Sequence, residues 1–280
     1  LEERLMEHAI PMPGRMIHDR EGQSTFQPYS ADGRRAINSV SRSELNLMLI
    51  EAADEHENVE LRFGVRAVDT DVPSGTVTFE RGADGSTFTE SADVVVGADG
   101  AGSVMRAALE DSLEECRSTQ DFLDHGYKEL SIPAVEEGPH APFAIEPAAL
   151  HIWPHGGSMM IALPNLDGTF TCTLFWPYAG PHSFESVTGE NVVELFRSHY
   201  PDALPIMPDL VEEYRENPVS RLGTIRFRPW HHGRVVLIGD AAHAIVPFYG
   251  QGANASFEDA VKLAEMIDSH PDDVPGALDA

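Results

Sequence analysis

Short, continuous apolar runs at two widely separated points predict strands that are buried on both faces. The runs are Asp93–Val96 and Arg234–Gly239, and each is followed by a glycine-containing loop and then by a helical pattern. Strands of a parallel sheet carry apolar side chains at consecutive positions because helices cover both faces of the sheet. Each run therefore predicts a strand–loop–helix unit of an α/β fold.

Other segments between these runs have their own periodicities. A helix is predicted after Ser41, with Glu44 completing a possible capping box. Its apolar positions recur at spacings of three and four, which is typical of one buried helix face: Leu45, Met48, Leu49, Ala52 and Ala53. Val59–Phe63 predicts the next strand, and a turn between Thr76–Glu80 and Ser86–Glu90 predicts a hairpin.

The middle of the chain alternates between polar and apolar positions, which indicates an antiparallel sheet. The predicted strands are Leu130–Ile132, His151–Trp153, Ser158–Leu163 and Thr169–Trp176. The predicted fold class is therefore α/β, with a nucleotide-binding domain that is split in sequence by a β-sheet substrate domain. Residues 37–115 and 230–280 are assigned to the first domain, and residues 10–36 and 116–229 to the second.

Composition and charge narrow the possible partners. The chain has 280 residues, of which 42% are hydrophobic, and its formal net charge is -27. This charge argues against direct nucleic-acid binding, because phosphate contacts need clustered Lys and Arg. No apolar stretch approaches the roughly 20 residues of a membrane-spanning helix. Cys116 and Cys172 lack a metal-binding spacing and are interpreted as buried packing residues, and the histidines likewise predict no metal site.

The strongest candidate chemistry follows the second apolar run. Ligands of open α/β sheets bind beyond the carboxyl ends of strands, where Asp240 could accept a hydrogen bond from a ribose or ribityl hydroxyl. Gly250 and Gly252 then lead into a helix whose N-terminus would stabilise an anion. Asp99 and Gly100 follow the first run in the same way. Taken separately, either segment could also be a tight turn with no ligand.

Together the two segments resemble the paired signature of the group A FAD-dependent aromatic hydroxylases. The signature is Gly-Ala-Asp-Gly at residues 97–100 and Gly-Asp-Ala-Ala-His at residues 239–243. The resemblance runs from about Ile10 to Asp259, and within the family it points to the branch that acts on L-kynurenine. It is carried by residues 15–18, 39–42, 45–46, 125–130, 150–154, 160–165, 170–175 and 243–259.

The resemblance implies a Rossmann-like FAD domain that is incomplete in this chain, since the family's first strand and its G-x-G-x-x-G turn are missing. We therefore expect a piece cut at both ends, one that binds FAD poorly. The implied activity is hydroxylation of L-kynurenine to 3-hydroxykynurenine, with FAD as cofactor and NADPH and O2 as co-substrates. The implied location is the cytoplasm for a bacterial member and the mitochondrial outer membrane for a eukaryotic one.

The resemblance also assigns site residues. Arg15 and Tyr29 are expected to hold the substrate carboxylate, for which a guanidinium is well shaped. Pro247, Phe248, Tyr249 and Gln251 are expected to line the substrate pocket. The expected FAD contacts are Arg42, Ala67, Asp99, Gly100, Asp240, Gly252, Ala253 and Asn254. No protein acid–base pair or nucleophile is expected, because the flavin carries the oxygen-transfer chemistry.

Three other functions remain open at this point. A related hydroxylase of another aromatic acid would also use Arg15. A non-catalytic flavin-binding protein could share the scaffold. A nicotinamide dehydrogenase is disfavoured by the Gly-Asp-Ala-Ala-His segment at residues 239–243.

Overall fold

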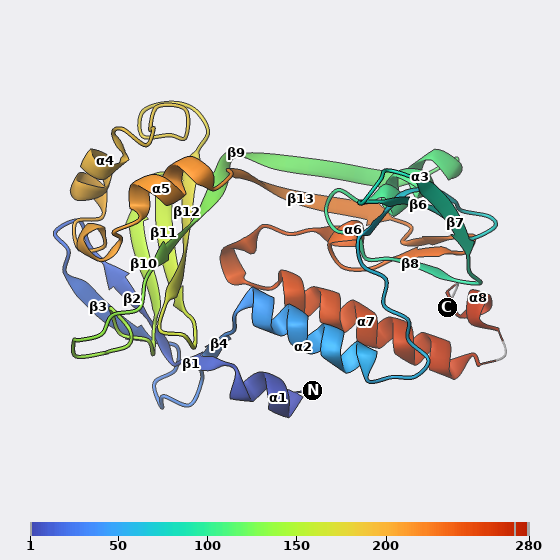
Figure 1. The fold of residues 1–280 in the computed structure, drawn as a ribbon, viewed down its shortest axis with the longest axis horizontal. Coiled ribbons are helices and arrows are strands. Elements are labelled where there is room, and N and C mark those ends of the chain that lie inside the picture. Colours follow the sequence, from blue (N-terminus) through green and yellow to red (C-terminus); the bar gives the residue numbers. More distant parts are fainter. Residues whose placement is uncertain (1, 272, 279–280) are drawn as a thin grey trace. The chain divides into compact units, whose positions relative to one another are not determined.

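The chain forms two compact units, each built from two separate stretches of sequence. A computed structural model describes residues 2–271 and 273–278 (Figure 1). Unit 1 comprises Leu1–Leu61 and Asp124–Arg221, and unit 2 comprises Arg62–Leu123 and Leu222–Ala280. The predicted arrangement, an α/β unit interrupted in sequence by a β-sheet unit, is confirmed.

A mixed sheet with the strand order β13-β9-β12-β11-β10-β2-β3 dominates unit 1. Its strands are β2 (Gly14–His18), β3 (Ser24–Pro28), β9 (Arg117–Ile132), β10 (Leu150–His155), β11 (Ser158–Pro164), β12 (Phe170–Pro177) and β13 (Ser220–Arg228). Strands β9 and β13 each run through both units. Buried positions alternate along β11 and the second half of β9, as expected for a sheet with one face on a core.

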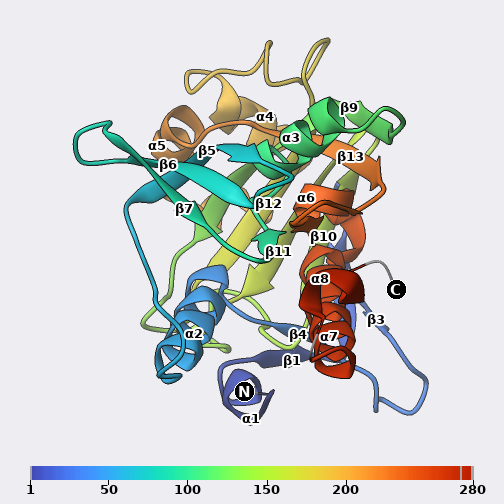
Figure 2. The ribbon, with the colours of Figure 1, turned by 90° about the vertical axis from the view of Figure 1, so that its right-hand side faces the viewer.

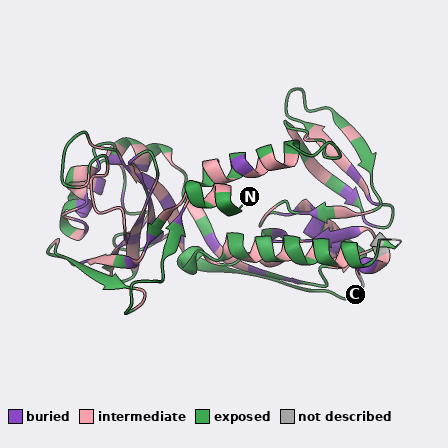
Figure 3. Ribbon diagram, turned by 90° about the horizontal axis from the view of Figure 1, so that it is seen from below, coloured by how far each residue is buried: buried purple, intermediate pink, exposed green. Residues whose placement is uncertain are grey.

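Helices α4 (Val192–His199) and α5 (Leu210–Glu216) complete the core of unit 1, with the 3-10 turn η1 (Leu204–Ile206) between them. The core joins apolar side chains of the sheet to those of the helices: Trp153, Phe170, Leu174, Trp176, Phe196, Tyr200 and Leu210. Figure 3 shows buried positions along the strands of this sheet. Burying large aromatic side chains supplies most of the driving force for such a unit.

The N-terminal stretch of unit 1 adds α1 (Glu2–Glu7), α2 (Arg42–Asp54) and the antiparallel pair of β1 (Ile10–Met12) with β4 (Ile37–Ser39). Ser41 caps α2 by accepting a hydrogen bond from the Glu44 backbone N–H at 3.5 Å. The buried Glu44 Oε2 has no hydrogen-bond partner among the described residues, so this oxygen does not make the reciprocal bond of the predicted capping box. Half of the box is thus confirmed.

Unit 2 holds two three-stranded sheets. One is the antiparallel sheet of β5 (Val65–Asp71), β6 (Thr76–Arg81) and β7 (Thr87–Ser91), in which β6 and β7 are the predicted hairpin. The other has the order β14-β15-β8, from His231–His232, Val235–Leu237 and Val95–Gly97. In the core of unit 2, Leu237 and Phe227 pack with Met105 and Leu109 of helix α3 (Val104–Ser112).

The C-terminal part of unit 2 is helical. It contains α6 (Asp240–His243), the 3-10 turn η2 (Pro247–Tyr249), α7 (Gly252–Ser269) and α8 (Val274–Ala277), and α8 packs on α7 (Figure 2). Within the described ranges, no helix combines the length and the hydrophobicity that crossing a bilayer requires.

Three sequence predictions are wrong or incomplete. Val59–Phe63 forms no strand; the next strand begins at Val65, and Val59 and Phe63 are 45% and 71% exposed because no strand pairs with them. Strand β8 pairs in parallel as predicted, but it stands at the end of its sheet and Val96 is 43% exposed. Cys172 is buried as expected, whereas Cys116 is exposed.

The boundaries of the units also differ from the predicted domains. Residues 37–61 fall in unit 1, although the sequence pattern placed them in the nucleotide-binding domain. The pairing of β4 with β1 ties the start of this stretch to the N-terminal residues of unit 1.

Shortening a fully buried side chain should destabilise unit 1 far more than the same change at its surface. Leu174→Ala should lower the free energy of unfolding by about 2–5 kcal/mol, because it leaves a cavity in the core. Leu166→Ala is the matched control, since Leu166 is 46% exposed. Urea unfolding of both variants checks this, and equal losses would contradict the assigned core.

Candidate functional site

The two glycine-containing loops of unit 2 leave the same edge of one sheet. Strands β8 and β15 pair in parallel, with Val95 opposite Val235 and Gly97 opposite Leu237. The Ile238 N–H donates to the Gly97 carbonyl at 3.1 Å, which extends the pairing to the strand ends. The structure therefore brings together the loop of Asp99 with Gly100 and the loop that leads to Asp240, as the sequence predicted for a nucleotide-type site.

A buried arginine joins these two loops. The Arg106 guanidinium donates from Nη1 to the Ala241 carbonyl at 2.8 Å and from Nη2 to the Ala101 carbonyl at 2.6 Å. Its side chain is only 4% exposed. Arg106 is not among the predicted site residues, although an arginine in the helix directly after a glycine-rich loop was an available signal. Two charge-assisted hydrogen bonds to carbonyl groups fix the separation of the loops.

Asp99 accepts hydrogen bonds at the start of helix α3. Its carboxylate accepts hydrogen bonds from Ser103 Oγ at 2.5 Å and from the backbone N–H groups of Val104 at 2.7 Å and Met105 at 3.2 Å. These bonds satisfy N–H groups that a helix N-terminus leaves without partners. Gly100 has a φ of +79° with no heavy atom near the place of a side chain. The predicted contacts of both residues with a cofactor stay predictions.

The turn after β15 is held in a conformation that favours glycine. Gly239 has φ 59° and ψ -142°, and an added Cβ would lie 2.7 Å from Ser256 Oγ. Asp259 Oδ2 accepts from the Gly239 N–H at 2.7 Å and lies 2.6 Å from His243 Nε2. His243 is thus tied through Asp259 to the turn at Gly239. Asp240, which follows Gly239 in the sequence, is exposed, and its carboxylate has no partner among the described residues.

The N-terminus of α7 presents polar backbone groups. Gly250 adopts the left-handed conformation at φ 61°, and the first helical bond runs from the Ala255 N–H to the Gln251 carbonyl at 3.0 Å. The N–H groups of Gly252, Ala253 and Asn254 precede that bond. The first turn of α7 contains no acidic residue. The positive end of the helix dipole is therefore not compensated by a carboxylate within its own first turn.

The remaining predicted residues of unit 2 flank this helix start. Phe248 and Tyr249 in η2 are 45% and 88% exposed, so each presents an aromatic surface. The Gln251 amide donates to the Tyr249 carbonyl at 3.1 Å and accepts from Asn254 Nδ2 at 3.1 Å. Ala67 lies on β5 beside a register shift and packs partly buried against the core.

In unit 1, the structure brings Arg15 and Tyr29 together on one hairpin. Arg15 on β2 donates from Nε to Gln27 Oε1 of β3 at 3.1 Å, and its side chain is exposed. The Tyr29 N–H donates to the Pro13 carbonyl at 2.9 Å. Burial raises the pKa of Tyr29, and the nearby charge of Arg15 partly offsets this. The phenol is therefore protonated at neutral pH and able to donate.

Arg42 lies at the start of α2 in unit 1. Its side chain is 85% exposed and forms an ion pair with Glu129 at 3.4 Å. An exposed pair of this kind contributes little stability, so the guanidinium can exchange its partner.

A hollow of about 1260 Å³ in unit 2 is lined by none of the predicted site residues. Its mostly apolar lining includes Leu113, Trp230, Leu237, Leu263 and Met266. Among the described residues, no three His, Cys, Asp or Glu side chains are grouped so as to hold a metal ion.

The residues of unit 2 fit a flavin. Asp240 offers an acceptor for a hydroxyl of the ribityl chain, and the start of α7 offers N–H groups and a positive potential to a negatively charged ring. The close approach of Gly239 to Ser256 leaves no room for a side chain at the turn between them.

Comparisons with known proteins identify the family of the chain and several relatives. Residues 1–270 match the family described as FAD binding domain. The chain is 46% identical over 269 residues to the kynurenine 3-monooxygenase of Myxococcus xanthus, covering 95% of this chain and 57% of that protein. It is 48% identical over 261 residues to the kynurenine 3-monooxygenase of Dictyostelium discoideum, covering 92% and 55%. The chain thus spans a little over half the length of these relatives.

Two solved structures share the fold. The tetrameric form of 2-methyl-3-hydroxypyridine-5-carboxylic acid oxygenase matches with a TM-score of 0.76 and 21% identity, covering 99% of this chain and 69% of that chain. Klebsiella pneumoniae HpxO complexed with FAD and uric acid matches with a TM-score of 0.67 and 22% identity, covering 98% and 68%.

A side chain at residue 239 should disturb the turn that carries Asp240. Gly239→Ala should lower the free energy of unfolding by about 1–3 kcal/mol, because alanine is strained at this φ and its Cβ would clash with Ser256. Gly102→Ala is the control, since its Cβ would meet no atom within 4 Å and its φ is ordinary. Chemical unfolding of the two variants gives the comparison; a fully stable Gly239→Ala variant would rule out the strained turn.

Proposed function

Because the chain belongs to the FAD binding domain family, we propose that it forms the flavin- and substrate-contacting part of an NADPH-dependent monooxygenase acting on L-kynurenine. The observation that carries the proposal is its identity of 46% and 48% to two kynurenine 3-monooxygenases over more than nine-tenths of its length. The paired loops of unit 2 and the Arg15–Tyr29 hairpin of unit 1 would supply groups that this chemistry needs.

The proposed reaction converts L-kynurenine, O2, NADPH and H⁺ into 3-hydroxykynurenine, NADP⁺ and water. Bound FAD would supply electron transfer from NADPH and the activation of O2 for attack on the aromatic ring. The protein's part is to bind, orient and exclude water, which agrees with the lack of a predicted catalytic acid–base pair. A bacterial form would act in the cytoplasm and a eukaryotic form at the mitochondrial outer membrane.

The residues of unit 2 would hold the flavin. Asp240 would accept a hydrogen bond from a ribityl hydroxyl, because its carboxylate is exposed at the end of β15. The N–H groups of Gly252, Ala253 and Asn254 would stabilise negative charge on the ring. Gly100 would let the backbone pass close to the cofactor. Asp99 would act by shaping this loop, since its carboxylate is bound to the start of α3.

Other residues would act at the edges of the flavin and at the substrate. Arg42 would exchange Glu129 for an FAD phosphate, and Ala67 would meet the adenine side through its backbone. Pro247, Phe248 and Tyr249 would form a dry apolar wall, which limits the loss of activated oxygen to water. Gln251 would contact the substrate amino group after giving up its hydrogen bond to Tyr249.

Arg15 and Tyr29 would bind the carboxylate of the substrate. A guanidinium binds a carboxylate through two parallel hydrogen bonds, and a protonated phenol adds a third. The raised pKa of Tyr29 keeps that proton in place. Any aromatic acid could bind this pair through its carboxylate. Selectivity for the aromatic ring of the substrate must therefore come from other residues of the pocket.

Kynurenine should stimulate NADPH oxidation by the full-length protein, with 3-hydroxykynurenine as the product. The matched control is kynuramine, which keeps the aromatic amine but lacks the carboxylate that Arg15 would bind. We expect kynuramine to stimulate much less. Stopped-flow absorbance and product chromatography measure both, and oxidation unaffected by kynurenine would refute the proposal. Stimulation by a different aromatic acid would instead identify a related hydroxylase.

Removing the guanidinium should weaken substrate binding. Arg15→Ala should raise the KM for kynurenine about 10- to 100-fold, since charge-assisted hydrogen bonds contribute roughly 1.5–3 kcal/mol. Arg197→Ala, at an exposed position of α4, is the control and should leave the KM unchanged. Steady-state kinetics test this, and an unchanged KM in Arg15→Ala would remove the role.

A further inference from the structure

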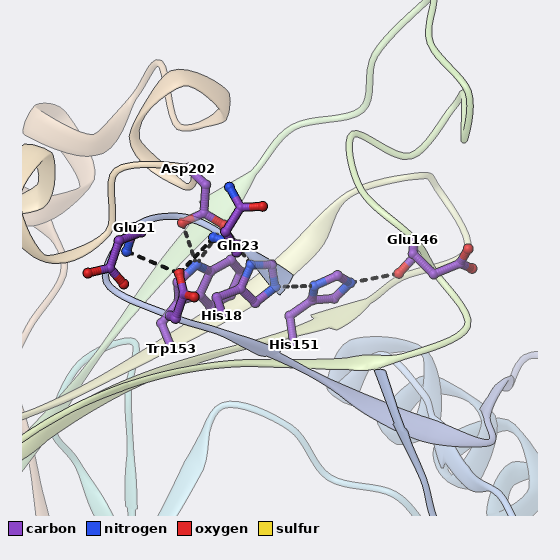
Figure 4. Close-up of polar contacts among 8 residues, drawn as sticks. His18, Glu21, Gln23, Glu146, His151, Trp153 and Asp202 are labelled. Atoms are coloured by element: carbon purple, nitrogen blue, oxygen red, sulfur yellow. Dashed lines mark hydrogen bonds and ion pairs between the residues drawn. The ribbon is translucent and has the colours of Figure 1, made fainter. Parts of the chain in front are cut away.

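A chain of hydrogen bonds crosses the buried side of unit 1 beneath strand β2 (Figure 4). His18 Nδ1 lies 2.6 Å from Asp202 Oδ2, and His18 Nε2 lies 2.8 Å from His151 Nδ1. His151 Nε2 lies 2.7 Å from the Glu146 carbonyl oxygen. The two imidazoles are 6% and 2% exposed. Buried polar groups of this kind must satisfy one another, so the positions of their protons can be assigned.

The Glu146 carbonyl fixes the proton position of His151. A carbonyl oxygen can only accept, so His151 must carry its proton on Nε2. Burial lowers the pKa of His151 to about 4, with the charge of His18 also acting to lower it and the bond to Glu146 acting to raise it. His151 is therefore neutral at ordinary pH, and its Nδ1 can only accept. It follows that His18 donates to it from Nε2.

The Asp202 end requires a second proton on the same ring. Asp202 accepts from Trp153 Nε1, at 3.0 Å to Oδ1 and 3.2 Å to Oδ2. Burial raises the pKa of Asp202, but the hydrogen bond and charge of His18 and the bond from Trp153 outweigh this, and the pKa is lowered. Asp202 is thus a carboxylate that only accepts. His18 must also donate from Nδ1, which makes it an imidazolium.

This network sits where the hairpin of β2 and β3 joins the rest of its sheet. Strand β2 pairs with β10 at three positions only, from Leu150 opposite Arg15 to Ile152 opposite Ile17. The His18 ring stacks on Trp153 of β10 at 4.1 Å between centroids. The hydrogen bond from His18 to His151 also crosses this short pairing. Side-chain contacts therefore strengthen a parallel strand pairing that has few backbone hydrogen bonds.

The closed end of the hairpin rests on Asp202 as well. A Cβ added to Gly22 would lie 3.3 Å from the Cβ of Asp202, so the turn approaches that residue closely. Asp19 Oδ1 closes the turn by accepting from the backbone N–H groups of Glu21 at 3.0 Å and Gln23 at 2.7 Å. Asp202 thus contacts the hairpin both through His18 and at its turn.

We propose that His18 is held as an imidazolium and that, with Asp202, it positions strand β2 and so Arg15. This proposal rests on the role proposed for Arg15. Arg15 lies three residues before His18 on the same strand, with its exposed side chain on the face opposite the buried imidazole. Strand β2 cannot shift or tilt without breaking the network, so a fixed His18 fixes the carboxylate-binding guanidinium. An error of about 1 Å in such positioning can lower activity strongly.

Two substitutions at residue 202 separate the charge from the hydrogen bonds. In Asp202→Asn, the amide can donate to His18 Nδ1 and its oxygen can still accept from Trp153, so a neutral His18 completes every bond. In Asp202→Ala, these bonds are lost. We expect Asp202→Ala in the full-length protein to raise the KM for kynurenine about 10-fold with little change in kcat, consistent with a loss of about 1.4 kcal/mol in binding. We expect Asp202→Asn to retain a KM close to that of the native protein.

The proton assignment is tested without any activity measurement. In the native chain with 15N-labelled histidine, NMR should show both ring nitrogens of His18 protonated at neutral pH, and His151 as the neutral Nε2–H form. The His18 signals are identified by their loss in His18→Asn. In Asp202→Asn, His18 should become neutral. A neutral His18 in the native chain would overturn the proposal, even if Asp202→Ala failed to fold.

The KM values of the variants could also contradict the positioning role of His18 and Asp202. If Arg15→Ala raises the KM while Asp202→Ala leaves it at the native value, His18 and Asp202 do not position Arg15. If Arg15→Ala itself has no effect, the proposed function of Arg15 fails and the positioning role falls with it. The NMR result distinguishes that case, because the imidazolium would still be observed.

Discussion

The parallel pairing of β8 with β15 is the constraint on which the candidate cofactor site depends. These strands come from segments on either side of the whole β-sheet insertion, yet Val95–Gly97 and Val235–Leu237 align position by position. Parallel pairing makes both chains leave at one edge, so two glycine-containing loops meet there. Arg106 then fixes the gap by bonding to a carbonyl in each loop. Without that register, neither loop alone would make a site.

Both units hold buried charges through groups that can only accept. Arg106 bonds to two carbonyl oxygens, and Lys128 in unit 1 donates to the carbonyls of Tyr214 and Asn217. Burial lowers the pKa of Lys128, which shows the energetic penalty of removing an ammonium from water. Such groups add little net stability, but an alternative packing would leave them without partners. They therefore favour one arrangement of loops and strands over others.

The proposed chemistry would require neither a nucleophile nor an acid–base pair from the protein. A flavin performs the bond making, so the protein needs position, electrostatics and dryness. In the proposed function, the buried network beneath β2 would provide position, the start of α7 would provide electrostatic stabilisation, and the apolar residues of η2 would exclude water. The first is a property of unit 1 and the other two belong to unit 2.

Local patterns predicted much of the secondary structure and of the candidate site. The hairpin of β6 and β7, the helices after Ser41, Ser103 and Gly252, and the buried strand at Val235–Leu237 follow from periodicity and glycine placement, which act over a few residues. The pair of loop motifs indicated a nucleotide-type site for the same reason. The failures arose where pairing decides the outcome, as at Val59–Phe63, which lacks a partner strand, and at Val96, which lies on an edge.

Only the tertiary structure decided which polar side chains meet. His18, His151 and Asp202 are distant in sequence, and nothing in their spacing indicated a shared hydrogen-bond network. Their contact depends on the parallel pairing of β2 with β10 and on the segment that follows α4. The role of Arg106 likewise appears only once residue 241 lies beside the loop at residue 101. Secondary-structure preferences are determined by neighbouring residues, whereas hydrogen-bond partners and burial are determined by segments that folding brings together.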